Sequence, residues 1–173
     1  MPGSVFLRGE GVELRTVESD DLAFVKDQIN DPDVWGTLGM SAPRNQHNEE
    51  QWLERTSEDD DRVHLLVCDD GDPVGLMGLH VNSTWGVGEL GYWVAPESQG
   101  NGYCTAAVRL VSRYAFEERR LHKVVAEAYD HNPGSQRVLE KVGFTQEGVH
   151  REEAFVGGEY RDLLHYGLLE DEL

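Results

Sequence analysis

A glycine-rich turn between an apolar run and a helical pattern is the feature that most constrains this chain. Residues 94–110 read VAPESQGNGYCTAAVRL, with Gly100 and Gly102 directly before the helical spacing begins. A helix N-terminus presents unpaired N–H groups and a partial positive charge, and glycine lets a ligand approach the backbone because it has no Cβ. The pattern therefore predicts a phosphate or pyrophosphate site. A turn that needs glycine only for its sharpness is the alternative that these two residues leave open.

Two familiar phosphate-binding motifs do not fit this turn. A P-loop requires Gly-Lys-Ser/Thr, whereas no lysine lies between Lys26 and Lys123. A dinucleotide-binding fingerprint requires a third glycine at position 105, where the chain has Thr105. Neither nucleotide-binding class is therefore predicted.

Apolar periodicity predicts that residues 1–173 form one α+β domain, a mixed and mostly antiparallel sheet flanked by about four helices. The expected strands cover residues 5–17 as a hairpin, 63–68, 73–81, 87–94, 122–129, 145–156 and 160–169. The expected helices cover about 18–29, 47–58, 102–119 and 133–142, and residues 31–46 read as a loop. Asn132-Pro133 and Gly143 predict the start and the end of the last helix.

The chain is strongly acidic, with 15 basic and 33 acidic residues and a formal net charge of −18. Such a surface repels nucleic acid and attracts cationic amines, although an evenly solvated surface adapted to high salt is the interpretation we favour. No apolar stretch approaches the ~18 residues that a membrane span needs, and no signal peptide is evident, so a cytoplasmic protein is expected. Two cysteines and seven scattered histidines predict neither a disulfide framework nor a metal site.

Three stretches of the chain carry a family resemblance. They are GELGYWV at residues 88–94, QGNGYCT at 99–105 and NPGSQRVLEKVGF at 132–144, and the segment 147–162 follows the same pattern. The second stretch resembles the Gln/Arg-x-x-Gly-x-Gly/Ala acetyl-coenzyme A signature of the GNAT superfamily. The others are similar to its ribosomal-protein N-terminal acetyltransferase (RimJ/RimL) branch. The resemblance covers nearly the whole chain and implies a GNAT fold and an enzyme that acetylates a primary amine with acetyl-CoA.

The resemblance also implies where acetyl-CoA lies. In this family the pyrophosphate rests on the backbone amides of the turn, and the pantetheine arm lies against the preceding strand and near an asparagine. The positions that match are Trp93, Val94, Gln99, Gly100, Asn101, Gly102, Tyr103, Cys104, Thr105 and Asn132. Arg137, on the following helix, is a further candidate for a phosphate. Asn101 departs from the basic residue that is common in the family at its position.

Acetyl transfer to an amine needs a base, a stabilised oxyanion and a proton for the departing thiolate. Glu89, within an otherwise apolar strand, is the candidate base, and a solvated sheet face is its alternative role. A backbone N–H near Val94 would meet the oxyanion. By the resemblance Ser135 or water is the candidate proton donor, because Leu139 stands where many superfamily members have a tyrosine. The alternative is a purely structural role, in which Asn132 caps the helix and Ser135 simply lies in its first turn.

Cys104 offers a rival mechanism through an acetyl-cysteine, because a thiol at a helix N-terminus can be nucleophilic. We favour a small buried filler at this position.

The resemblance implies that the acceptor lies between the loop of Trp35 and Leu38 and the hairpin that carries Tyr160. The first hypothesis is a protein N-terminal amine, as in the ribosomal-protein enzymes. A small amine such as a polyamine or an antibiotic is the alternative, and a CoA-binding module without catalysis is a third. Homodimerisation is left open.

Overall fold

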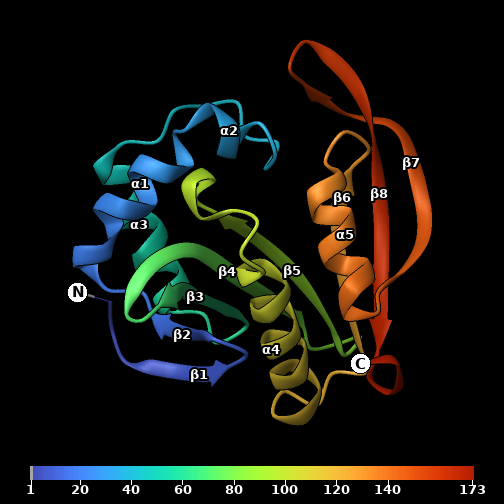
Figure 1. The fold of residues 1–173 in the computed structure, drawn as a ribbon, viewed down its shortest axis with the longest axis horizontal. Helices are drawn as coiled ribbons and strands as arrows, with labels where there is room; N and C mark the ends of the chain where they lie inside the picture. The colour runs from blue at the N-terminus through green and yellow to red at the C-terminus, as the bar shows by residue number, and fades with distance from the viewer. Residues whose placement is uncertain (1) are drawn as a thin grey trace.

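Eight strands pair into one sheet, in the order β1-β2-β3-β4-β5-β6-β8-β7, in the computed structural model, which describes residues 2–173 (Figure 1). The strands are β1 (Val5–Gly9), β2 (Val12–Thr16), β3 (Arg62–Asp69), β4 (Asp72–Asn82), β5 (Val87–Val94), β6 (Lys123–Tyr129), β7 (Thr145–Val156) and β8 (Glu159–Leu169). All neighbouring pairs are antiparallel except β5 and β6. The α+β class and the mixed, mostly antiparallel sheet are therefore confirmed.

The helices begin and end close to where the sequence predicts them. They are α1 (Leu22–Ile29), α2 (Pro32–Trp35), α3 (Gln46–Ser57), α4 (Tyr103–Glu117) and α5 (Pro133–Val142). Helix α5 follows its predicted signals: the Asn132 side chain accepts a hydrogen bond from Ser135 N at 3.2 Å, and Gly143 closes the helix at φ 116°. The short helix α2 lies within the segment predicted as a loop. The sequence contains a helix-start signal here, because Asp31 caps α2 with its side chain and Pro32 occupies the first helical position.

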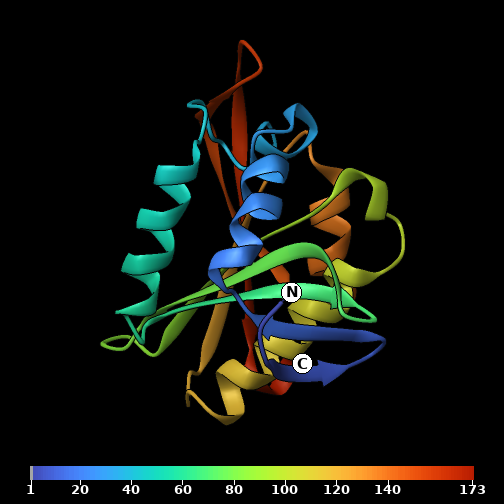
Figure 2. The ribbon, with the colours of Figure 1, turned by 90° about the vertical axis from the view of Figure 1, so that its left-hand side faces the viewer.

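The helices cover both faces of the sheet, α1 and α3 on one face and α4 and α5 on the other (Figure 2). Successive strand residues point to opposite faces, and Leu65 and Leu66 of β3 show the result. Leu65 lies in the core shared with α4 and α5, whereas Leu66 lies in the core with Val25 of α1. No helix in residues 2–173 is long and apolar enough to cross a membrane.

The parallel contact between β5 and β6 is short, and this positions the site. The two strands pair from Val87 with Lys123 to Leu90 with Ala126 and then separate. Helix α4 follows β5 and helix α5 follows β6, so both helix N-termini lie at the open end of the gap (Figure 1). Ligands of open α/β sheets bind beyond the carboxyl ends of parallel strands in this way.

Candidate active site

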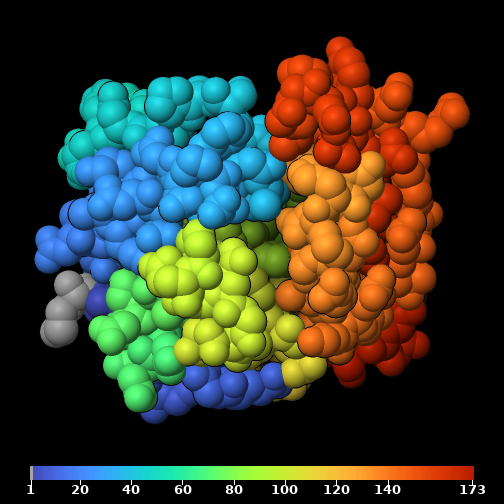
Figure 3. Space-filling model, turned by 45° about the horizontal axis from the view of Figure 1, so that its top comes forward, coloured from blue at the N-terminus to red at the C-terminus, as the bar shows by residue number. Residues whose placement is uncertain are grey.

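The gap between β5 and β6 opens into a cavity of about 580 Å³. Figure 3 shows it as a hollow between the blue segment near α2, the yellow-green start of α4 and the orange helix α5. Of the residues predicted for the site, the cavity is lined by Leu38, Glu89, Trp93, Val94, Gln99, Gly100, Gly102, Tyr103, Cys104, Thr105, Asn132, Ser135 and Arg137. Residues that lie up to about a hundred positions apart in the sequence therefore meet around one hollow.

The glycines of the turn at the mouth of α4 have the backbone geometry of a sharp turn and leave open space beside the backbone. Gly100 and Gly102 have φ values of 80° and 82°, a backbone region that other residues adopt rarely. A Cβ at either position would meet nothing within 4 Å, so the backbone here is also open to a ligand. The Gln99 side chain donates to the Val94 carbonyl at 3.3 Å and ties the turn to the end of β5. The first amides of α4 are therefore held at the cavity, where an anion is favoured.

Two cations on α5 face the same cavity. Arg137 and Lys141 stand four residues apart, on one side of the helix, and both side chains are exposed. Neither forms an ion pair with another residue in the part of the chain that the structure describes. They are suited to the phosphates of acetyl-CoA. The sequence analysis missed Lys141, although its spacing from Arg137 was the available signal.

Three predicted residues are not brought to the cavity by their side chains. Asn101 folds into its own turn, where its amide donates to the carbonyls of Ser98 at 3.0 Å and Gln99 at 3.3 Å. Trp35 is 38% exposed at the end of α2, whose Asp33 and Val34 line the cavity instead. Tyr160 is 67% exposed and packs on Phe155 at the far end of its hairpin.

Carboxylates gather on the opposite side of the cavity from the cations. Glu89 on β5, Glu127 on β6 and Asp33 on α2 line it, and all three are exposed. Glu89 therefore lies on a solvated face that is also a wall of the cavity. Burial raises the pKa of Glu127, and the charges of Glu89 and Glu153 add to the effect. The sequence analysis did not identify Glu127 or Asp33.

A pair of hydroxyls joins β5 to α5 across the cavity. The Tyr92 hydroxyl and the Ser135 Oγ lie 2.9 Å apart, and both residues line the cavity. Burial raises the pKa of Tyr92, so its hydroxyl keeps its proton. Leu139 is fully buried in the core and presents no group to the cavity. Tyr92 is a functional candidate that sequence reasoning missed, because its strand position gives no sign that the sheet is open beside it.

The thiol of Cys104 is held in its neutral form. Burial raises its pKa to about 12. A thiol with this pKa carries almost no thiolate at neutral pH, and the thiolate is the nucleophile. The environment of Cys104 therefore favours the predicted filler over an acetyl-cysteine.

A second cavity, of about 340 Å³, adjoins the first on the side of α1 and α3. Its lining is mainly apolar, and it shares four residues with the first cavity, namely Leu38, Gly91, Tyr92 and Trp93. Its polar and charged lining consists of the ion pair between Arg44 and the buried Glu49, 2.8 Å apart, and of His64 and His80, whose Nε2 atoms lie 3.3 Å apart. Burial lowers the pKa of His64 to about 4, so this ring is neutral above that pH.

The comparisons with known proteins agree with this geometry. The family model for the acetyltransferase (GNAT) domain matches residues 12–145. The "Putative ribosomal N-acetyltransferase YdaF" of Bacillus subtilis is 40% identical over 104 residues, which cover 60% of this chain and 57% of YdaF.

Two solved structures extend the likeness over almost the whole chain. The spermidine N-acetyltransferase of Vibrio cholerae, in complex with CoA and spermine, has a TM-score of 0.88 and 25% identity, and covers 94% of this chain and 97% of its own. RimJ of Mycobacterium smegmatis, in complex with CoA-disulfide, has a TM-score of 0.83 and 25% identity, and the match covers 94% of this chain and 83% of the RimJ chain.

Proposed function

This chain belongs to the GNAT family and is an acetyl-CoA-dependent N-acetyltransferase, and we propose that its acceptor is the α-amine at the N-terminus of a protein. The observation that carries the proposal is the junction of the two cavities at Gly91. Carboxylates line the first cavity near this point, and the second cavity is largely apolar. The N-terminal residue of a protein has two matching parts. Its cationic amine suits the carboxylates of the first cavity, and its side chain suits the adjoining second cavity.

The basicity of an α-amine also suits a site with Glu89 as its base. An α-amine has an ordinary pKa of about 7.7–8.0, against about 10.4 for a lysine side chain. A single carboxylate therefore suffices to complete deprotonation near neutral pH. Glu89 holds this place and takes the proton from the amine directly or through one water.

The remaining groups of the chain act on the thioester. As the amine nitrogen attacks the carbonyl carbon, a backbone N–H at the end of β5 near Val94 stabilises the oxyanion. The C–S bond then breaks, and the thiolate takes a proton from Ser135. The proton that the attacking nitrogen releases as the amide forms passes through solvent to Ser135 and restores its hydroxyl. Tyr92, 2.9 Å from Ser135 Oγ, orients that hydroxyl and keeps its own proton because its pKa is raised. Arg137, Lys141 and the amides of the turn bind the phosphates.

A polyamine is the second candidate acceptor, and a specific observation favours it. Asp33, Glu89 and Glu127 come from three different elements and offer several carboxylates around one cavity. A polyamine carries several ammonium groups, which such a set can bind simultaneously. The structural likeness to a spermidine acetyltransferase supports this candidate too.

Acetyl-CoA turnover with a matched panel of amines tests the proposal. Thiol release is measured with peptides of identical sequence after the first residue, with the same peptides acetylated at the N-terminus, and with spermidine and spermine. We expect turnover with free N-termini, a dependence on the first side chain, and none with the blocked peptides. Turnover confined to the polyamines would replace the proposal by the second candidate. Acetyl-CoA binding without turnover on the whole panel would contradict both candidates.

A further inference from the structure

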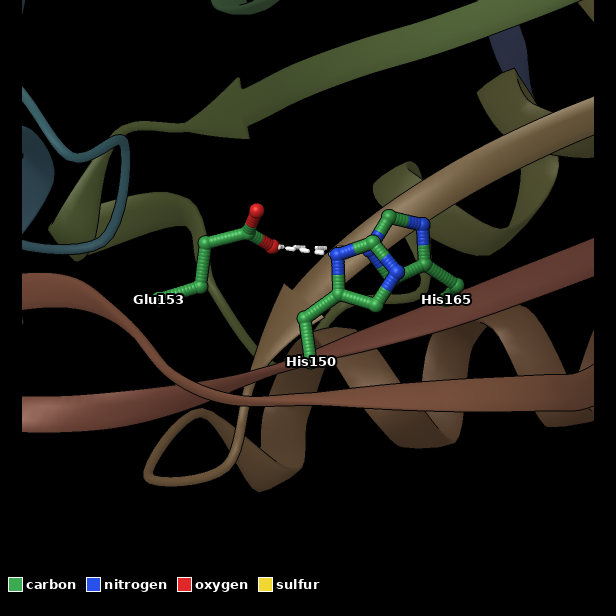
Figure 4. Close-up of side chains that lie close together, drawn as sticks. All are labelled: His150, Glu153 and His165. Carbon is green, nitrogen blue, oxygen red and sulfur yellow. Dashed lines mark hydrogen bonds and ion pairs between the residues drawn. The ribbon is translucent and has the colours of Figure 1, made fainter.

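Two histidines and a glutamate meet on the outer strands of the sheet, away from the acetyl-CoA turn (Figure 4). His150 and Glu153 belong to β7, and His165 belongs to the neighbouring β8. One ligand atom of each lies within 4.8 Å of the others. An irregularity of β7 between His150 and Ala154 brings Glu153 back beside His150. The three side chains therefore form a cluster that their sequence spacing does not reveal.

The nitrogen atoms of His165 are oriented by a second carboxylate. Its Nδ1 lies 3.3 Å from Glu127 Oε1, on the strand paired with β8. A proton held at Nδ1 leaves the lone pair on Nε2, which faces the cluster. This Nε2 is buried and has no hydrogen-bond partner among the described residues. Carboxylate–histidine pairs of this kind orient the histidine ligands of metal sites.

The cluster is compact enough to surround a small metal ion after small side-chain movements. Zinc bonds of about 2.0–2.2 Å in a tetrahedron place neighbouring ligand atoms about 3.4 Å apart. The observed distances lie on either side of this value: His165 Nε2 is 3.9 Å from Glu153 Oε2, and His150 Nδ1 is 2.5 Å from it, in a hydrogen bond that a bound ion would replace. The rings of His150 and His165 lie only 3.8 Å apart between centroids, so two protonated rings would repel each other.

We propose that His150, Glu153 and His165 form a binding site for a divalent transition-metal ion of the zinc class, with Glu127 as the group that orients His165. Two imidazoles and a carboxylate are a ligand set that zinc accepts, and the fourth position is open to water. Hard cations such as Mg²⁺ prefer oxygen ligands and are not expected here. Glu127 also lines the first cavity, which we call the acetyl-transfer cavity. The metal site therefore shares a residue with the proposed active site.

Calorimetric titration of the purified, tag-free chain with Zn²⁺ tests the site. We expect one ion per chain, no response to Mg²⁺, and an affinity at least tenfold weaker in His150→Ala and in His165→Ala. Glu127→Gln should weaken zinc binding about tenfold, since loss of an orienting partner costs 10- to 100-fold. His47→Ala is the matched control, because this exposed histidine lies on α3. Its affinity should equal that of the unmodified chain.

A thermal melt gives a second, independent readout. A ligand that binds only the folded chain raises Tm with concentration, so excess Zn²⁺ should stabilise the unmodified chain and His47→Ala. The His150→Ala/His165→Ala double variant, checked by circular dichroism for an unchanged fold, should show no such rise. No zinc binding by the unmodified chain, or equal affinity in the double variant, would overturn the proposal.

Discussion

The two sides of the acetyl-transfer cavity are built in different ways. The side at α4 and α5 presents backbone amides, two glycines at positive φ and two cations. The opposite side presents carboxylates from three elements, beside a cavity that holds two histidines. The first side is therefore defined by local backbone conformation, and the second by the strand register that places Glu89 and Glu127 and by the position of α2, which carries Asp33. Substitutions should separate these two contributions.

The largest effect is expected at the carboxylate side. Glu89→Gln removes the base and should lower kcat about 10²- to 10³-fold, because general base catalysis contributes about 10²–10⁴-fold. The KM for acetyl-CoA should change little, since the turn is untouched. Steady-state thiol release measures both constants. Glu54→Gln on the exposed surface of α3 is the control, and an equal loss of kcat in both variants would contradict the assignment.

The second effect is on stability and arises in the second cavity, which His64 and His80 line. The folded-state pKa of His64 is about 4, below its ordinary value of 6.5, so folding favours the neutral ring. Its contribution is complete above pH 6.5 and is lost as the pH falls toward 4, at most about 3 kcal/mol. Urea unfolding between pH 7 and 4 should show this decline, and His64→Gln should reduce its slope. An unchanged slope would show that other groups cause the decline.

A third and smaller effect tests the backbone side. Gly102→Ala forces alanine into φ 82°, at a cost of about 1–2 kcal/mol, and should weaken acetyl-CoA binding about tenfold as the turn shifts. Gly11→Ala is a close control, because Gly11 has φ 83° and equally open surroundings in the β1–β2 turn. Both variants should lose similar stability, but only the first should lose affinity in a CoA titration. Equal CoA affinities in the two variants would show that the turn does not bind the cofactor.

The smallest effect is expected at Cys104. Cys104→Ala should keep kcat within about twofold, because the neutral thiol contributes no nucleophile at pH 7. Initial rates with saturating acetyl-CoA provide the measurement. Loss of turnover with an intact circular dichroism spectrum would revive the acetyl-cysteine mechanism.

The contrast between parts of the site fixed by local conformation and parts fixed by strand pairing also explains which features could be predicted from the sequence. The turn at Gly100 and the caps of α5 depend on a few neighbouring residues, and the structure places them as predicted. The sequence analysis missed Tyr92 and Glu127, because their part in the site depends on where β5 and β6 separate and on how β8 pairs with β6. Trp35 and Tyr160 lie away from the cavity for a similar reason. The orientation of a short helix or a hairpin tip depends on packing that no local pattern encodes.

The short contact between β5 and β6 has a consequence for the lifetime of the protein. Beyond Leu90 and Ala126 the sheet is interrupted in its interior, so this region lacks the ladder that holds the other strands together. A co-substrate that fills the gap binds the folded chain alone, and at 100 times its Kd it adds about 2.7 kcal/mol to the free energy of unfolding. Proteolytic degradation follows the population of opened molecules. The abundance of this enzyme in a growing cell should therefore rise and fall with the supply of acetyl-CoA.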